Sequence, residues 1–126
     1  MAHGLDKNSV QENANSTEDA GSEAIKSLLQ NKALPQAIVC ASDLIAIGVL
    51  RALRQAKVNV PDDVAVVGYD NIAVSAYTTP SLTTVQQNTK LAGELLVNTL
   101  LKAINNEEVE DYLMPADIII RQSCGS

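Results

Sequence analysis

Apolar residues occur along the chain either at helical spacing or in short continuous runs, and the order of these two patterns predicts the order of the helices and strands. Residues 17–31 carry acids in their first turn and an apolar stripe at helical spacing, which predicts an amphipathic helix. Residues 36–41 (QAIVCA) and 64–70 (VAVVGYD) are short continuous apolar runs, typical of strands covered on both faces. Between them Ser42 stands as an N-cap for an apolar segment reaching about Ala56, which predicts a deeply buried helix.

The strand, helix and strand between residues 36 and 70 predict a parallel sheet, because parallel neighbours need a crossover connection of this kind. After a loop over 72–80, residues 82–88 predict a short extended piece, and residues 88–104 predict a long amphipathic helix. A polar link then leads to a last strand at 118–120. The whole pattern predicts an α/β fold.

The first 15 residues differ from the rest of the chain. They are polar and rich in asparagine without an apolar period, which predicts a loop, a disordered lead or an expression remnant. Residues 16–126 form the predicted domain, and Ser16 and Asp19 are spaced like a capping box at its first helix. His3, the only histidine, lies in the lead without a ligand set around it, so we expect no metal site.

Charge and cysteine content narrow the class of protein. The formal charge of −6 argues against a nucleic-acid surface, because nine basic residues are scattered among fifteen acids. No apolar run approaches the roughly 20 residues that span a bilayer, and no secretory signal pattern opens the chain, so we expect a cytoplasmic location and no membrane partner. Cys40 and Cys124 have neither a disulfide-framework nor a metal-type spacing, which predicts two reduced thiols. No cofactor is expected.

Polar side chains follow three of the predicted strands at the points where the strands end. They are, in chain order, Ser42 and Asp43, Asp70 and Asn71, and Gln87 and Asn88. Ligands of open parallel sheets gather at the carboxyl ends of the strands, where carboxylates and amides suit a polyhydroxylated molecule. A second interpretation fits the same spacing: Ser42 and Asp43 cap a helix, and Asp70 and Asn71 form a turn.

An enzyme is the weaker interpretation. With one histidine and no G-x-S-x-G, Cys–His pair or glycine-rich phosphate loop, the usual nucleophilic and phosphoryl-transfer groups are missing. Asp43 and Asp70 could do acid–base work, yet nothing beside them in the sequence distinguishes an acid from a base. A phosphorelay receiver domain would need an acidic pair after its first strand and a late strand ending in Lys-Pro, and this chain has neither.

Five blocks of sequence together resemble the C-terminal stretch of LacI/GalR-type transcription regulators. They are P-Q-A-I-V-C-A-S-D-L-I-A-I-G-V-L-R-A-L, V-P-D-D-V-A-V-V-G-Y-D-N-I, T-P-S-L-T-T-V-Q-Q-N, A-G-E-L-L and L-M-P-A-D-I-I-I-R-Q-S. All five occur in the family's order and spacing between about Ser16 and Ser123. The resemblance implies a three-layer parallel-sheet half of a periplasmic-binding-protein-like type I fold. In the family, a sugar, nucleoside or purine bound between two lobes controls attached DNA-binding headpieces.

The resemblance also implies where the effector and a second copy would bind. Effector contacts in the family fall at positions matched here by Ser42, Asp43, Asp70 and, more weakly, Gln87. Part of the dimer interface falls around 73–82, and the candidates there are Ala76, Tyr77, Thr79, Pro80 and Leu82. Ser42 departs from the family's common asparagine, and the chain has no Phe or Trp to stack on a sugar ring.

The resemblance further implies that the helix over 88–104 belongs to the first lobe, most of which we expect this chain to lack together with the headpiece. Its apolar stripe would then have no partner: Leu91, Leu95, Leu96, Leu100, Leu101 and Ile104. Burying each such side chain is worth about 1.5–3 kcal/mol, so exposure favours self-association or exchange of the helix between copies. The predicted function is effector sensing and dimerisation in a sugar- or nucleoside-responsive repressor that meets DNA only through the headpiece. A sugar-binding protein of a transport system is the alternative.

Overall fold

The computed structural model describes residues 17–111 and 114–125. Its helices and strands occur in the order that the sequence predicts. They are α1 (Glu18–Gln30), β1 (Ala37–Val39), α2 (Asp43–Gln55), β2 (Ala65–Val67), β3 (Thr84–Gln87), α3 (Thr89–Ile104) and β4 (Ala116–Ile119), with short 3-10 helices η3 (Ala73–Tyr77) and η4 (Gln122–Cys124). The expectations for the lead, for His3 and for Ser16 lie outside the described residues.

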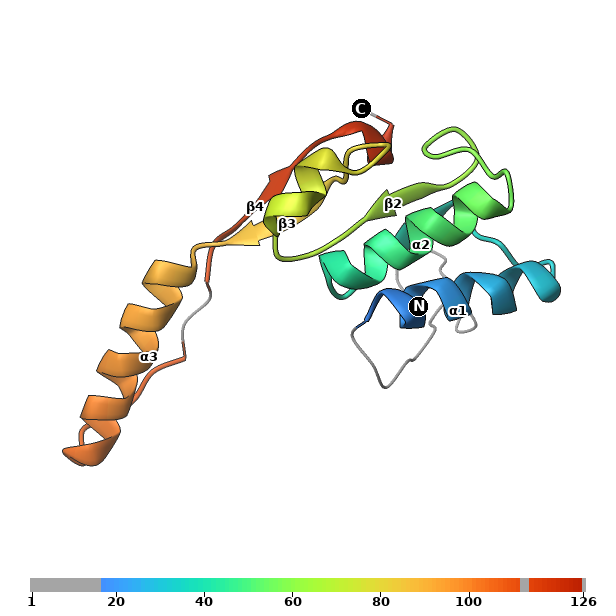
Figure 1. Cartoon of the computed structure of the whole chain (residues 1–126). Coiled ribbons are helices and arrows are strands. Elements are labelled where there is room, and N and C mark those ends of the chain that lie inside the picture. The colour runs from blue at the N-terminus through green and yellow to red at the C-terminus, as the bar shows by residue number, and fades with distance from the viewer. Residues whose placement is uncertain (1–16, 112–113, 126) are drawn as a thin grey trace.

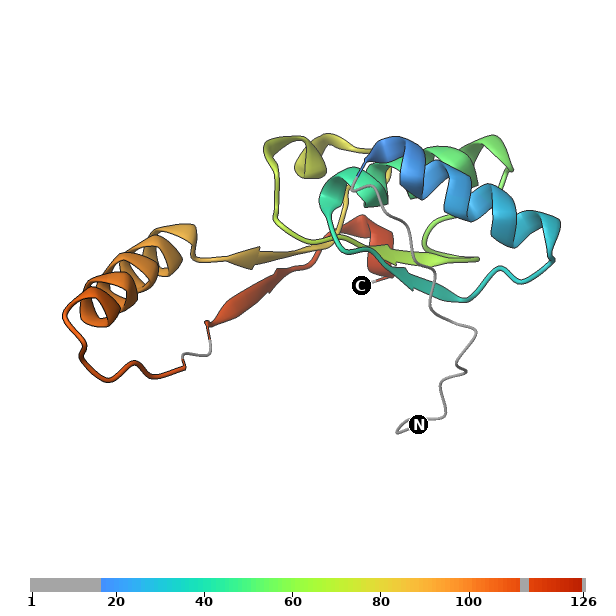
Figure 2. The ribbon, with the colours of Figure 1, turned by 90° about the horizontal axis from the view of Figure 1, so that it is seen from below.

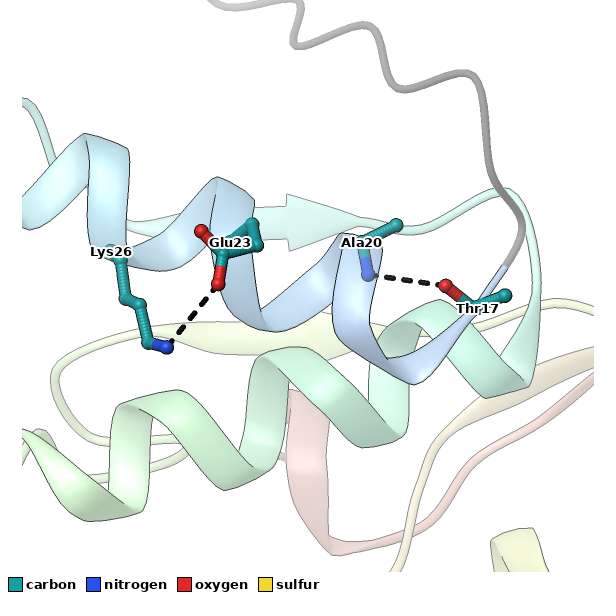
Figure 3. A network of polar contacts seen from close by, with 4 residues as sticks. All are labelled: Thr17, Ala20, Glu23 and Lys26. Atoms are coloured by element: carbon teal, nitrogen blue, oxygen red, sulfur yellow. Dashed lines mark hydrogen bonds and ion pairs between the residues drawn. The ribbon is translucent and has the colours of Figure 1, made fainter.

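Each long helix begins at a side-chain cap. Thr17 Oγ1 accepts the N–H of Ala20 at 3.3 Å, so α1 is capped one residue later than the predicted Ser16 position (Figure 3). Ser42 caps α2 as predicted, since its Oγ accepts the N–H of Ile45 at 3.3 Å. Asn88 caps α3 in the same way. The sequence therefore fixes where each helix starts through a local hydrogen bond.

The strands form two two-stranded sheets, β1–β2 and β3–β4. β1 and β2 are parallel, with Ala37 opposite Ala65, which confirms the predicted crossover pairing. β3 is joined to the end of β2 by a parallel bridge between Val67 and Thr83. β4 then pairs antiparallel with β3. This antiparallel edge was not predicted, and it arises because the chain returns through β4 after leaving through α3.

Helices α1 and α2 cover the same face of the β1–β2 sheet and lie close to each other (Figure 2). Two glycines permit this approach. A Cβ on Gly21 would collide with the backbone carbonyl of Ile45, and a Cβ on Gly48 would collide with that of Glu18. The core beneath the helices is aliphatic; its buried members include Ile25, Cys40, Val49, Leu53, Val64, Val66 and Leu82. The predicted deep burial of α2 holds for one face only, because Leu44 is 43% exposed.

We expect Gly48→Ala to lower the free energy of unfolding by at least about 1–3 kcal/mol, because the added methyl group forces the two helix backbones apart. Urea denaturation followed by circular dichroism measures the change. Gly93→Ala is the matched control, since Gly93 lies in α3 with nothing within 4 Å of its missing Cβ. That substitution should stabilise the helix by roughly 0.5–1 kcal/mol. Equal destabilisation by both variants would contradict the close packing of α1 and α2.

Helix α3 extends away from the rest of the chain at the end of the β3–β4 ribbon (Figure 1). None of its residues is buried. Leu96 is 71% exposed, Leu100 61% and Ile104 65%. On the ribbon itself, Ile118 and Ile120 are 65% and 61% exposed. Leu91 and Leu95 are half-buried, so the expectation that the stripe has no partner is confirmed only for its other four members: Leu96, Leu100, Leu101 and Ile104.

We expect the isolated chain to self-associate through α3, because water-exposed leucines at this density favour contact with another apolar surface. Analytical ultracentrifugation over a range of concentrations should show a dimer or larger species. Leu96→Lys combined with Leu100→Lys should shift it towards the monomer, whereas Leu44→Lys, an exposed leucine of α2, should not. A wild-type chain that stays monomeric throughout the range would contradict this prediction.

Candidate functional site

Backbone hydrogen bonds join the strand ends that carry the predicted polar side chains. The N–H of Asp43 donates to the carbonyl of Tyr69 at 2.8 Å, which joins the end of β1 to the end of β2. The N–H of Asp70 donates to the carbonyl of Val85 at 2.8 Å, which joins the end of β2 to β3. Ser42, at the first of these ends, is half-buried, whereas Asp70 is exposed. Three neighbouring parallel strand ends therefore present polar groups on the same side.

Asp43 lies beneath this edge rather than on it, which corrects the expectation that it contacts a ligand. Its side chain is 0% exposed. Its Oδ1 accepts the Thr84 hydroxyl at 2.6 Å, and its Oδ2 accepts the N–H of Ile72 at 2.9 Å. As the first residue after the Ser42 cap, it points from the start of α2 towards the sheet. Both carboxylate oxygens are therefore occupied by groups of the chain.

The room for this carboxylate comes from Gly68, the residue after β2. A Cβ at Gly68 would collide with Asp43 Oδ1. Packing against Asp43, rather than an unusual backbone conformation, thus explains why glycine occupies this position of the V-V-G-Y-D block. Any side chain there would displace the carboxylate that holds the strand ends together.

Cys40 lies close to Asp43 in the same buried region. Burial, and to a lesser degree the negative charge of Asp43, together raise the pKa of the Cys40 thiol to about 12. The thiol therefore stays protonated and unreactive at neutral pH. Within the described residues, neither Cys40 nor Cys124 takes part in a disulfide.

The turn after β2 has an unusual backbone. Asp70 and Asn71 have φ angles of 112° and 56°, a region that few residues other than glycine occupy. Neighbouring groups hold the turn: the N–H of Asn71 donates to Thr84 Oγ1, and its Nδ2 donates to Gln86 Oε1, both at 3.2 Å. Two strained residues in a row persist only where surrounding contacts support them, and such positions gather at ligand sites. The strained turn of Asp70 and Asn71 therefore forms part of the polar edge at the strand ends.

Gln87 and Asn88 end β3 with exposed side chains. Asn88 is used as the cap of α3, because its Oδ1 accepts the N–H of Leu91 at 3.1 Å. Gln87 is the last residue of β3 and stands beyond the position where that strand meets Asp70. Of the predicted site residues, Ser42, Asp70 and Gln87 thus remain at the edge.

The candidates for a dimer interface separate into two groups. Tyr77 is 83% exposed, Ala76 and Thr79 are also exposed, and Pro80 is half-buried. Leu82 is 0% exposed and belongs to the core, so its assignment to an interface is wrong. It begins the stretch that pairs with β2, and its side chain points into the sheet's covered face.

Sequence reasoning missed the residues that support the site from a distance. Thr84 and Arg121 both bond to the turn or to Asp43, from positions 41 and 50 residues away along the chain. Thr84 lies within an extended T-T-V-Q-Q-N piece, and Arg121 follows an apolar strand, so neither position carries a local signal of its own. Only the sheet order brings them to the turn.

We expect Asp43→Asn to destabilise the chain by about 1–3 kcal/mol, because the amide can accept only one of the two donors and the other is left buried without an acceptor. Urea denaturation at neutral pH measures it. Asp62→Asn is the matched control, since Asp62 is an exposed carboxylate ahead of β2. No difference between these two variants would show that the Thr84 and Ile72 bonds do not hold the edge together.

Comparison with known proteins first defines the class of domain and then the family. The family model described as a periplasmic binding protein-like domain matches residues 1–124. The ribose operon repressor of Escherichia coli (strain K12) is 38% identical over 104 residues, which cover 82% of this chain and 32% of the repressor. The chain belongs to the LacI-type transcription regulators and forms part of their periplasmic-binding-protein-like domain, as the five sequence blocks predict.

Solved structures agree with this assignment. The transcriptional regulator CelR in complex with cellobiose superposes with a TM-score of 0.81 at 32% identity, over 94% of this chain and 37% of that chain. The lac repressor dimer bound to operator and the anti-inducer ONPF superposes with a TM-score of 0.78 at 29% identity, over 86% of this chain and 38% of that chain. The chain spans about a third of the length of the curated relatives.

Proposed function

We propose that this chain is an effector-sensing part of a LacI-type repressor and that Ser42, Asp70 and Gln87 form one wall of the effector site. The supporting observation is that these residues come from the ends of three adjacent parallel strands, at an edge fixed by the buried Asp43 carboxylate. Asp70 is exposed and lies in a turn with positive φ angles, so its carboxylate is accessible from solvent. A carboxylate flanked by a hydroxyl and an amide matches the hydroxyl groups of a sugar or a nucleoside.

A saccharide or a nucleoside is the favoured effector. The named relatives include a ribose operon repressor and a regulator solved with cellobiose, both of which point to sugars. A sugar-binding protein of a transport system would have the same fold. The relatives support it less, because those named are transcription repressors or regulators.

The remaining parts of the proposal concern partners, location and catalysis. Tyr77 and its neighbours Ala76, Thr79 and Pro80 form an exposed loop suited to contact with a second copy, and one structural relative is a dimer. DNA would be met through a headpiece of the full-length regulator, in the cytoplasm. No helix in the described ranges is long and apolar enough to cross a membrane. The chain acts by binding, without catalysis; the similarity to proteins named as transcription repressors supports this part of the proposal.

Native mass spectrometry with a panel of pentoses, hexoses, nucleosides and purines tests the proposed site. One class of panel member should be retained by the wild-type chain. Asp70→Asn should weaken its binding roughly tenfold or more, because a hydrogen bond to a charged acceptor is lost. Asparagine tolerates the positive φ of this position, so the turn is kept.

Asp62→Asn is the control, because it removes an equally exposed carboxylate from the loop that precedes β2, at the opposite edge of the sheet. It should leave binding unchanged. Equal binding by the wild type and by Asp70→Asn would contradict the assignment of the site to this edge. Retention of no panel member would contradict the expectation that this chain holds an effector on the proposed wall.

A further inference from the structure

Arg121 stands where the C-terminal strand meets the turn and the exposed loop. It follows β4, and its backbone N–H donates to Thr83 Oγ1 at 2.8 Å. Its Nη1 donates to Ser75 Oγ and to the carbonyl of Leu82, and its Nη2 donates to Asn71 Oδ1, all at 2.9 Å. These three acceptors are uncharged, so the contacts fix geometry rather than neutralise a charge.

On one side, Arg121 holds the strained turn next to the proposed ligand wall. Asn71 is adjacent to Asp70, and its Oδ1 also accepts the Ser75 hydroxyl at 3.2 Å. The N–H of the next residue, Ile72, is fixed by the buried Asp43. A displacement of Asp70 therefore moves the adjacent Asn71. The movement of Asn71 in turn shifts its Oδ1, which accepts a hydrogen bond from the Arg121 guanidinium.

On the other side, Arg121 closes the loop that carries Tyr77. Ser75 and Leu82, the two ends of this loop, are joined by a backbone bond of 2.9 Å from the N–H of Leu82 to the carbonyl of Ser75. Both ends also bond to the same Nη1 of Arg121. The guanidinium is planar and its donors have fixed relative directions, so the turn and the loop cannot move independently while all three bonds are kept.

A second arginine holds the same loop without touching the turn. Arg54 Nη2, from the last turn of α2, donates to the carbonyl of Thr79 at 2.6 Å. Substitution of Arg54 therefore loosens the loop alone, whereas substitution of Arg121 also removes the link between the loop and the ligand wall. Arg54 is thus a matched control for Arg121 within the same chain.

We propose that Arg121 is a positioning residue that couples the Asp70–Asn71 turn to the exposed loop 76–81, so that an event at the ligand wall changes the surface offered to a second copy. The coupling itself is a property of the hydrogen-bond network. Its use as a signal rests on the proposed function.

Residue-resolved hydrogen exchange by NMR on the 126-residue chain tests the coupling without a ligand. The reporters are the N–H groups of Asn71 and Ile72 in the turn, and of Ser75 and Leu82 in the loop. Arg121→Lys keeps the charge but loses the fork, so all four should exchange roughly tenfold faster or more, as for the loss of a hydrogen bond to a charged group.

The controls separate coupling from general loosening. Arg54→Gln should speed exchange within the loop only, and Arg51→Gln, at an exposed position of α2, should speed neither segment. Acceleration by Arg121→Lys that is confined to Ser75 and Leu82, or that is equally large at Leu53 in the core, overturns the proposal. Asn71→Gly provides a second route, because glycine accepts the positive φ of this position. It should speed exchange at Leu82, and an unchanged Leu82 rate also overturns the coupling.

Adding the panel member that native mass spectrometry shows to be retained then tests the signal. The wild type should gain protection in both the turn and the loop, whereas Arg121→Lys should gain it in the turn alone. Protection of the loop that survives in Arg121→Lys overturns the signalling role of Arg121. If no member of the panel is retained, the expected effector binding fails, and the ligand-free exchange rates still decide the coupling.

Discussion

The buried carboxylate of Asp43 is the interaction on which the rest of the site depends. Placing a charge at 0% exposure is costly unless hydrogen bonds replace its water, and here the Thr84 hydroxyl and the Ile72 N–H do so. Thr84 lies in β3 and Ile72 lies in the turn after β2. The two bonds therefore fix the position of the start of α2 relative to β3 and to this turn. Gly68 is a consequence, since the carboxylate occupies the space of its missing Cβ. The carboxylate thus adds two side-chain bonds to the backbone bonds that hold the strand ends of the proposed ligand wall together.

β3 connects two regions of very different packing. Its first residue, Thr84, is fully buried against Asp43, whereas its last residue, Gln87, is exposed and leads into α3. On one side, glycine contacts between α1 and α2 make a tightly packed body. On the other, α3 buries none of its own residues. The proposed ligand wall lies at this boundary, where it could contact groups on either side.

The turn, the loop and the C-terminal strand form one polar network around Arg121. It supports two consecutive residues of positive φ, whose conformations would be unfavourable in isolation. The network needs no carboxylate, because Arg121 is satisfied by two side-chain oxygens and a backbone carbonyl. The Arg121 side chain therefore stabilises both the strained turn at the proposed ligand wall and the two ends of the exposed loop.

The sequence by itself determined the order of helices and strands, the Ser42 cap, the parallel β1–β2 pairing and the family, because these follow from local periodicity, a local cap and ordered blocks. Only the tertiary structure decided that Asp43 is buried and that Leu82 is a core residue rather than an interface residue. The physical reason is that burial depends on partners far away in the sequence: Thr84 reaches Asp43 across 41 positions and Arg121 reaches Asn71 across 50. A polar residue at a strand end looks the same in sequence whether it faces a ligand or holds the strands together.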